Sequence, residues 1–277
     1  MPGSAFEIFA ATPAPHLQRG PVPDFDHRAG PYRVRFARGP ADLEQVQRLR
    51  FEIFNLELKE GLDESWQTGL DRDRFDAQCQ HLLVWDQEFG RAVGTYRLQT
   101  AEAARAGAGF YSADEFVLDA LPADVLEDSV ELGRACIARE HRNRTVLFLL
   151  WRGLAAYVAW YRKRWFFGCN SLTSQSPDYG LRTWDWLRAN DYAHSWLHVE
   201  PQPAWACDRV ATAGGDDPEA GRAVEIPTLF GIYLRYGGRV CGPPALDRFF
   251  KTVDFFTVLD LAAMDERTFS NFALDRA

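Results

Sequence analysis

Hydrophobic and polar positions alternate along residues 32–37, which is typical of a half-buried β-strand. Residues 40–58 begin with a proline and repeat their apolar residues at helical spacing. Two further alternating runs, residues 81–86 and 91–100, flank the short segment QEFG. The pattern therefore predicts a strand and a helix at the start of the chain, followed by an antiparallel hairpin.

The next part of the pattern is a strand, a long apolar helix and another strand. Residues 128–138 and 164–172 are strand-like, and residues 145–161 between them are almost entirely apolar. That apolar run is shorter than the roughly 20 residues of a membrane-spanning helix and contains Arg152, so we interpret it as a buried helix. Two strands joined by a helix lie parallel in one sheet, so the segment predicts a crossover in a mixed α/β fold.

Composition limits the classes of protein to consider. A chain of 277 residues with 47% hydrophobic content can bury a core as one large domain or two intimately packed halves. Its formal charge of -8 argues against nucleic acid as a partner, so any phosphate site must be local. Residues 1–30 are rich in proline, glycine and alanine and lack the pattern of a signal peptide, which predicts a poorly ordered arm.

The cysteines favour a cytoplasmic protein without a metal site. Their number is odd and none forms a CxxC pair or a metal-type spacing, which fits reduced thiols. We expect a cytoplasmic location, with peripheral attachment to the inner face of the membrane as a variant of it. The five cysteines are Cys79, Cys136, Cys169, Cys207 and Cys241.

Positive charge is concentrated where the predicted strand 128–138 gives way to the apolar helix. Arg142, Asn143, Arg144 and Thr145 stand at this junction. The free N–H groups and the dipole of a helix N-terminus favour an anion, and arginines sharpen that preference for phosphate. The alternative is a solvated loop with an asparagine or threonine cap.

A glycine interrupts the strand 128–138 between two charged residues. Glu131 and Arg134 are three apart, so a regular strand would point them to opposite faces. A bulge at Gly133 would shift the alternation, bring both side chains to one face, and splay the strand from its neighbour. Such an opening would expose a backbone N–H able to polarise a carbonyl. The alternative is a salt bridge on an edge strand.

A second charged group lies upstream of that strand. Three aspartates precede the first strand of the hairpin, an arginine stands in its second strand, and an arginine and a phenylalanine share one face of the first helix. Taken singly, these residues are equally consistent with turns, caps and ordinary surface or core positions. The group consists of Asp71, Asp73, Asp76, Arg97, Arg50 and Phe54.

The ordered set of these motifs resembles the ornithine lipid N-acyltransferases over residues 32–261. The resemblance implies a GNAT (acyl-CoA N-acyltransferase) fold over residues 31–277, with a mixed twisted sheet, helices on both faces, a splayed central cleft and a family-specific C-terminal extension. It also implies transfer of a 3-hydroxyacyl chain from acyl carrier protein to the α-amine of ornithine, which gives lyso-ornithine lipid. The segments that carry it are LRFEIF (49–54), DRFDAQCQHLLV (73–84), VGTYRL (93–98), ELGRACI (131–137), LLWRGLAAY (149–157) and residues 226–261.

The chain also resembles, more distantly, the acyl-homoserine lactone synthases. This resemblance implies the same fold and the same kind of donor, an acyl carrier protein. The tryptophan that those synthases carry after the first helix has no clear counterpart, since Leu58 and Glu60 occupy that region, so recognition of S-adenosylmethionine is not implied. Their signature pairs fit Arg50 with Phe54, Asp73 with Asp76 and Glu131 with Arg134, and their strand arginine fits Arg97.

The loop 139–146 lacks the glycines of the common acetyltransferase pyrophosphate loop. Side-chain cations suit one phosphate, which favours the phosphopantetheine thioester of acyl carrier protein as donor and predicts no tightly bound cofactor. In this interpretation Glu131 takes a proton from the attacking amine, and the strand opening stabilises the oxyanion. Asp73 and Asp76 would hold the side-chain ammonium of ornithine, while Arg97 or Arg134 would meet its carboxylate or order the acids.

Other functions stay open at this point. The acceptor could be another amine, such as glutamine, glycine or a lysine side chain, or the enzyme could act like an acyl-homoserine lactone synthase. The chain could also be a non-catalytic protein that binds an acyl carrier or a membrane, although Glu131 and the rest of the charged set argue against it. A lipid product would itself bring the enzyme into peripheral contact with the membrane.

Overall fold

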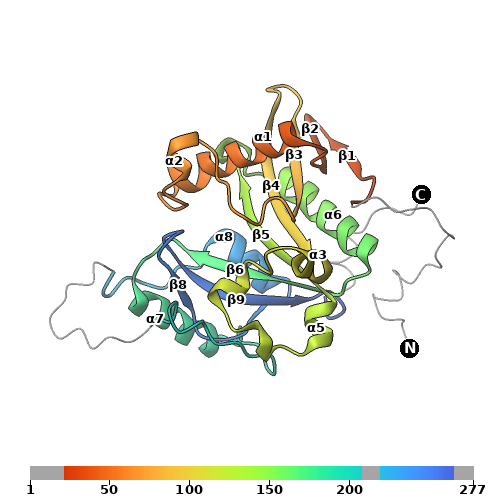
Figure 1. Cartoon of the computed structure of the whole chain (residues 1–277). Coiled ribbons are helices and arrows are strands. Elements are labelled where there is room, and N and C mark those ends of the chain that lie inside the picture. The colour runs from red at the N-terminus through yellow and green to blue at the C-terminus, as the bar shows by residue number, and fades with distance from the viewer. Residues whose placement is uncertain (1–21, 208–218, 265–277) are drawn as a thin grey trace.

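A mixed sheet of nine strands runs through the computed structural model, which describes residues 22–207 and 219–264 (Figure 1). The strands follow the order β1-β2-β3-β4-β5-β6-β9-β7, and β8 pairs separately with β9. All neighbours are antiparallel except β5 and β6. The strands are β1 (Asp26–Ala29), β2 (Tyr32–Phe36), β3 (Gln80–Asp86), β4 (Arg91–Thr100), β5 (Ser129–Ile137), β6 (Trp165–Leu172), β7 (Arg239–Val240), β8 (Ala245–Asp247) and β9 (Thr252–Asp260).

Helices connect and cover these strands. The main ones are α1 (Pro40–Phe51), α6 (Arg144–Tyr161), α7 (Pro177–Ala189) and α8 (Thr228–Arg235). Short helical segments fill the connections, and α1 continues directly into the π-helical turn η2. These short segments are η2 (Glu52–Glu57), α2 (Ser65–Thr68), α3 (Ala101–Ala106), α4 (Ser112–Glu115), η3 (Leu118–Ala120), α5 (Ala123–Glu127) and η4 (Arg139–His141).

The elements predicted from the hydrophobic pattern are confirmed. The expected strand and helix are β2 and α1 with η2, the expected hairpin is β3 and β4, and the expected crossover is β5, α6 and β6 with β5 and β6 parallel. Of the arm expected over residues 1–30, residues 1–21 lie outside the described residues, while residues 26–29 form β1. Among the described residues, none of the helices is long and apolar enough to span a lipid bilayer.

Helices α1 and α6 cover opposite faces of the sheet. Successive residues of a strand point to opposite faces. On β4, Gly94 lies against Val146 and Leu150 of α6. Arg97 is three residues further along and therefore points to the opposite face, where it donates a hydrogen bond to Asp76. Asp76 in turn is bound to Arg50 of α1. The α6 face is an apolar core, and the α1 face holds buried charge.

The sheet opens between β5 and β6. Their parallel pairing extends only from Ser129 opposite Trp165 to Glu131 opposite Phe167, although both strands continue for several residues. Just beyond this point β5 bulges. Thr95 of β4 pairs with Cys136 and Arg97 pairs with Gly133, so one residue of β4 lies opposite two residues of β5. The bulge predicted at Gly133 is therefore confirmed, and Arg134 within it adopts a φ of 49°.

Close backbone contact marks the start of the opening. A Cβ placed on Gly168 of β6 would lie 2.2 Å from the carbonyl oxygen of Leu132, so a larger residue there would force the two strands apart. Residues 226–261, expected to be a family-specific extension, form α8 and β7 to β9. They place β9 against the free side of β6 (Figure 1).

Candidate active site

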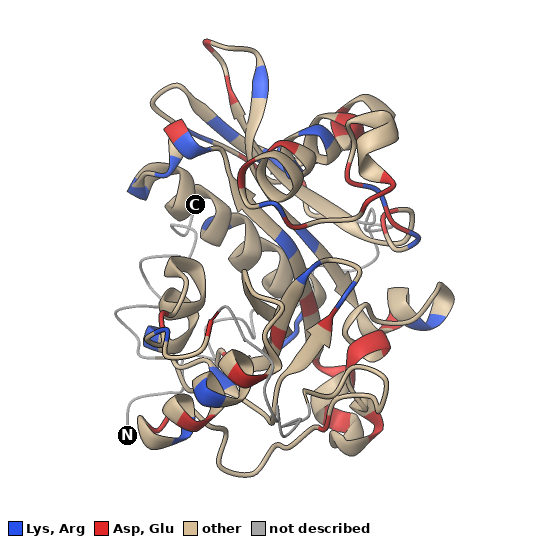
Figure 2. Cartoon of the chain, turned by 90° about the vertical axis from the view of Figure 1, so that its left-hand side faces the viewer, with Lys and Arg blue, Asp and Glu red and all other residues tan. Residues whose placement is uncertain are grey.

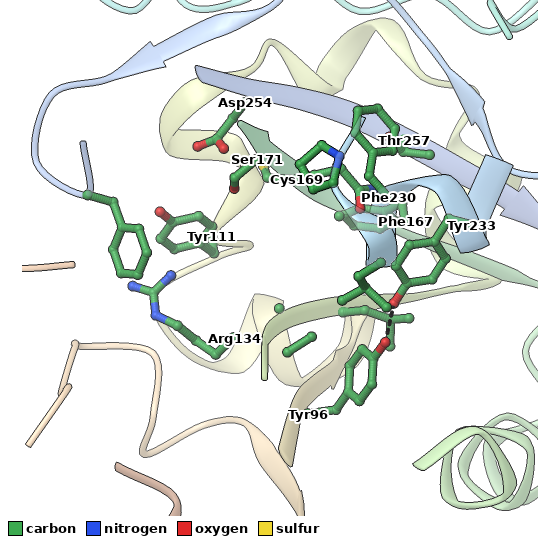
Figure 3. Close-up of a pocket in the computed structure, with 18 of the residues that line it drawn as sticks. Tyr96, Tyr111, Arg134, Phe167, Cys169, Ser171, Phe230, Tyr233, Asp254 and Thr257 are labelled. Atoms are coloured by element: carbon green, nitrogen blue, oxygen red, sulfur yellow. Dashed lines mark hydrogen bonds between the residues drawn. The ribbon is translucent and has the colours of Figure 1, made fainter. Parts of the chain in front are cut away.

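A cavity of about 280 Å³ fills the opening between β5 and β6. Both strands contribute to its wall immediately after their pairing ends, together with η2, α8 and β9. Figure 3 shows that the cavity has two chemically different ends, with the tyrosine pair Tyr96 and Tyr233 at one and Arg134, Tyr111, Ser171 and Asp254 at the other.

One end of the cavity is apolar. The lining residues Leu132 and Phe166 belong to the same apolar cluster as Tyr96 and Tyr233, and Leu229 of α8 packs against that cluster. The Tyr96 and Tyr233 hydroxyls form a hydrogen bond of 2.7 Å. In that bond one hydroxyl donates and the other accepts, so the two polar tips are turned toward each other. This end suits a hydrocarbon chain.

The other end carries ionisable groups. Arg134 is the one basic side chain among the described residues that line the cavity, and its guanidinium lies over the rings of Phe250 (4.3 Å) and Tyr111 (4.8 Å). Two carboxyls, Glu60 and Asp254, line the same cavity. A ligand with both a carboxylate and an amine would find a partner for each charge here.

Arg134 belongs to a closed ring of three arginines and three aspartates. Each arginine bridges two aspartates and each aspartate two arginines, at N···O distances of 3.4 Å or less. The side chains are 0–10% exposed, so the formal charges cancel inside the protein. Charged positions indeed lie on strands in the middle of the molecule as well as on its outer helices (Figure 2). In order, the ring runs Arg50, Asp71, Arg134, Asp73, Arg97, Asp76 and back to Arg50.

The ring keeps Asp73 and Asp76 ionised. Burial alone would raise the pKa of Asp76, but the guanidinium groups of Arg50 and Arg97 outweigh it and lower that pKa. Asp73 shows the same balance, because Arg97 and Arg134 lower its pKa against the effect of burial. These carboxylates are thus committed to arginines rather than available to a ligand.

The residues predicted to bind substrate divide accordingly. Phe54 and Arg134 line the cavity, whereas Arg50, Asp73, Asp76 and Arg97 do not; they form the ring behind it. The structure brings these four residues together, but their contacts are with one another and with the rest of the ring. Asp71, which completes the ring, was noted in the sequence without a role being assigned to it.

Glu131 also lies outside the cavity lining. Its carboxylate is 5% exposed and accepts hydrogen bonds from the backbone N–H of Tyr111 (3.1 Å) and Ser112 (2.7 Å), the Ser112 hydroxyl (2.7 Å) and the amide of Gln99 (2.5 Å). Glu131 and Arg134 both reach Tyr111, so the bulge does bring them to one face. Because donors already occupy both carboxylate oxygens, the contacts of Glu131 suit a group that positions Tyr111 and Ser112.

Glu60 has the environment that Glu131 lacks. It lies just beyond η2, is 6% exposed, and accepts a hydrogen bond from the Thr173 hydroxyl. Burial raises its pKa to about 7, and nearby Asp254 adds to the shift. Glu60, Tyr111 and Asp254 were not predicted as site residues. Glu60 follows a helix end like many surface glutamates, and only the fold brings the other two beside it.

The predicted phosphate-binding residues lie at the N-terminus of α6. Asn143 caps the helix by accepting a hydrogen bond from the Val146 N–H, as the loop interpretation expected. Arg142 makes a two-pronged ion pair with Glu57 of η2 at 2.7 and 2.9 Å, while Arg144 and Thr145 are exposed. An anion bound here would therefore meet the N-terminus of α6, where Asn143 already occupies the Val146 N–H, together with Arg144, and would compete with Glu57 for Arg142.

Comparisons with known proteins agree with this architecture. A family model described as "Acetyltransferase (GNAT) domain" matches residues 49–152, from the last residues of α1 to the first half of α6. The L-ornithine N(alpha)-acyltransferase of Brucella abortus (strain 2308) is 32% identical over 90% of this chain and 91% of its own length. The enzyme of the same name from Agrobacterium fabrum (strain C58) is also 32% identical, over 88% and 86%.

The solved structures that match this chain are more distant relatives. The acyl-homoserine lactone synthase LasI matches with a TM-score of 0.48 and 12% identity over 89% of this chain and 98% of its own. FeeM, described as an N-acyl amino acid synthase from uncultured soil microbes, matches with a TM-score of 0.45 and 9% identity over 84% and 92%. Similarity at this level says nothing about substrate.

The ring predicts a large stability cost for a single neutral substitution. Asp76→Asn keeps the shape but leaves Arg50 and Arg97 short of one buried anion, so we expect a loss of about 3–5 kcal/mol in urea unfolding at pH 7. The control Asp114→Asn removes an exposed ion pair with Arg74 and should cost about 1 kcal/mol or less.

The pH dependence gives the same prediction a second readout. Because the pKa values of Asp73 and Asp76 are lower in the folded chain than in the unfolded one, their contribution is present above about pH 4 and is lost as pH falls through the lowered values. The gap between wild type and Asp76→Asn should therefore narrow in acid. Equal stabilities of the two proteins at pH 7 would contradict the ring.

Proposed function

Because the chain belongs to the family of the L-ornithine N(alpha)-acyltransferases, we propose that its acceptor is the α-amine of ornithine and its donor an acylated carrier protein. The chain is an acyltransferase with a GNAT domain. The observation that carries the proposal is the single cavity with an apolar and a charged end, which meet where β5 leaves β6. A 3-hydroxyacyl chain would occupy the first end and an amino acid the second, and the product would be lyso-ornithine lipid.

The donor carbonyl belongs at the opening of the sheet. Beyond Glu131 the edge of β5 has no β6 partner, and residues 132–135 face the cavity instead. A backbone N–H here can donate to the thioester carbonyl and to the oxyanion that develops from it. The acyl chain then runs toward Tyr96 and Tyr233, and the phosphopantetheine arm runs toward the N-terminus of α6.

The phosphate of that arm would meet Arg142, Asn143, Arg144 and Thr145. One helix N-terminus with two arginine side chains suits a single phosphate better than the pyrophosphate of a coenzyme A nucleotide. This supports acyl carrier protein as the partner.

The acceptor would bind through its α-carboxylate to Arg134. The ring holds this guanidinium in place through Asp71 and Asp73, and the rings of Tyr111 and Phe250 flank it. A guanidinium fixed in this way loses little entropy on binding a carboxylate. The α-amine, one bond further along the substrate, would then point to the opening between the strands.

Glu60 is the group placed to take up the proton. The α-ammonium must lose one proton before its nitrogen attacks, and Glu60 faces the cavity with a carboxyl able to accept it near neutral pH. The C–N bond then forms, the C–S bond breaks, and the second nitrogen proton ends on the pantetheine thiol. Glu131, the base predicted from the sequence, would instead position Tyr111 and Ser112 at the cavity edge.

The proposed function is tested by product analysis. Purified protein is incubated with 3-hydroxyacyl carrier protein or the matching acyl-coenzyme A, and with ornithine, lysine, glutamine or glycine. Mass spectrometry should find N-acylornithine as the main product, formed fastest from the carrier protein. A preference for another amine would contradict the acceptor assignment, and the absence of any acylated product would favour a binding protein.

A double variant tests the predicted binding of the donor phosphate. Arg142→Ala/Arg144→Ala should raise the KM for the carrier protein in a salt-dependent way and leave the KM for ornithine unchanged, because charge complementarity acts mainly on encounter. An unchanged KM for the carrier protein would remove the phosphate role of these arginines.

Two variants, Glu60→Gln and Glu131→Gln, distinguish the roles of these two residues. In wild type, kcat should rise with pH through about 7, as Glu60 loses its proton. Glu60→Gln should lower kcat by about 10²–10⁴-fold and abolish this limb, with little change in melting temperature. Glu64→Gln, at an exposed position on the same segment, is the control and should change neither.

Glu131→Gln should behave differently. The amide turns one acceptor into a donor that faces the donors of Gln99, Tyr111 and Ser112, so the melting temperature should fall. Activity should drop by a similar factor at every pH. If Glu131→Gln instead kept its melting temperature and lost the limb near pH 7, Glu131 would be the base.

A further inference from the structure

Three buried carboxyl groups lie together beside the polar end of the cavity. Glu115 ends α4, Asp247 ends β8 and Asp254 stands in β9, and one ligand atom from each lies within 4.8 Å of the others. Glu115 is 0% exposed, and Asp247 and Asp254 are each 2% exposed. We refer to these three residues as the acidic trio.

The acidic trio differs from the ring because it has no cation. Among the described residues, no arginine, lysine or histidine forms an ion pair with any of the three. Asp247 accepts hydrogen bonds from the N–H groups of Phe249 and Phe250 and from the Tyr111 hydroxyl, so both of its oxygens are occupied. Asp254 uses one oxygen for the Thr252 hydroxyl.

Three oxygens of the acidic trio accept no hydrogen bond of standard geometry, although Tyr111 and Ser171 lie close enough to act on the pKa values of these carboxyls. They are both carboxylate oxygens of Glu115 and the Oδ1 of Asp254. Burial raises the pKa of Glu115 well above its usual value, with help from Asp254 and Asp247. It also raises the pKa of Asp254 to about 6, with help from Asp247. Unpartnered buried acids are costly, so their retention needs an explanation outside the fold.

The acidic trio opens toward the cavity through Asp254. Asp254 is a lining residue, and Figure 3 shows its carboxylate beside Ser171 and near the Tyr111 hydroxyl. Arg134 stands across from it at the same end, with Tyr111 between them. An amino acid bound by Arg134 would therefore extend its side chain toward the acidic trio.

We propose that the acidic trio binds the side-chain ammonium of the acceptor, so that the enzyme selects an α-amino acid with a second, terminal amine. The inference rests on the proposed function and adds the residues that recognise the side chain. An ammonium carries three donors, which matches the three unpartnered oxygens. It also supplies the positive charge that the acidic trio lacks.

A divalent cation fits the acidic trio less well. Calcium takes six to eight oxygen ligands and magnesium requires near-octahedral geometry. Both oxygens of Asp247 already accept hydrogen bonds, so binding a metal would displace the N–H groups of Phe249 and Phe250 or the Tyr111 hydroxyl. An ammonium can use the unpartnered oxygens and leave these bonds intact.

The test compares ornithine with norvaline, which has the same carbon chain but no side-chain amine. Wild type should favour ornithine in kcat/KM by about 100-fold or more, since a site built to bond a polar group rejects an analogue that lacks it. Glu115→Gln and Asp254→Asn should each reduce that ratio at least about tenfold, mainly through the KM for ornithine. Glu127→Gln, at an exposed glutamate paired with Arg105, should leave the ratio unchanged.

Melting temperatures keep these variants interpretable. Because the substitutions neutralise buried, unpaired acids, the ligand-free variants should be at least as stable as wild type. Retained stability with a reduced ratio supports the proposal, whereas an unchanged ratio in both variants overturns it. If both variants fail to fold, calorimetric titration of wild type decides: ornithine must bind more tightly than norvaline, and equal affinities overturn the proposal.

The remaining outcomes separate the alternatives. A melting temperature of wild type that rises with magnesium, calcium or zinc chloride, and activity that is lost with a chelator, would assign the acidic trio to a metal and overturn the proposal. If wild type acylates norvaline as well as ornithine, the acyltransferase stands and the proposal fails. If it acylates no amino acid but calorimetry still shows tighter binding of ornithine, the proposed function fails and the ammonium site stands.

Discussion

The neutralisation of three buried arginines by three buried aspartates is the constraint on which the rest of the structure depends. The ring ties α1, the segment before β3, β4 and β5 together at the level where β5 leaves β6. Removing any one charge would leave its two partners buried in a low-dielectric environment without a full set of counter-charges. The ring also holds Arg134 in place, and this residue adopts a backbone conformation that non-glycine residues rarely use. Buried ion pairs thus anchor the strand that forms one wall of the opening.

This opening explains why one cavity can be apolar at one end and charged at the other. The α6 face of the sheet is a hydrocarbon core, and Tyr96 extends it to the cavity by pairing its hydroxyl with that of Tyr233. The α1 face carries the ring, and Arg134 extends it to the same cavity. The two substrates proposed for this enzyme differ in the same way, since one carries an acyl chain and the other is an amino acid. Their reacting atoms can meet only where the two environments meet.

The sequence predicted the order of strands and helices, and which charged residues belong together, better than it predicted the role of each residue. Periodicity located β3, β4, β5, α6 and β6, and one glycine predicted the bulge in β5. The ordered motifs pointed to the GNAT fold and to the charged residues of the ring. Which carboxylates are committed to arginines, and which face the cavity, depends on distances between segments far apart in the chain.

The same limit explains the residues that the sequence did not reveal. Glu115 and Asp254 are separated by well over a hundred residues, and neither has a local pattern that distinguishes it from a surface acid. Glu131 has the spacing of a catalytic acid, but the donors that occupy it come from the start of α4, about twenty residues earlier, and from Gln99 of β4. Burial and hydrogen-bond partners, which a single sequence does not encode locally, decide these roles.

The central claim is that donor and acceptor meet at the opening between β5 and β6. Its most direct test is a crystal structure of the protein with ornithine and a non-hydrolysable acyl-pantetheine analogue. We expect the oxygen that replaces the thioester carbonyl to lie about 3 Å from a backbone N–H of residues 132–135, with the acyl chain beside Tyr96 and Tyr233 and the ornithine carboxylate on Arg134. An acyl chain bound outside this cavity, or a carbonyl oxygen remote from β5, would contradict the account.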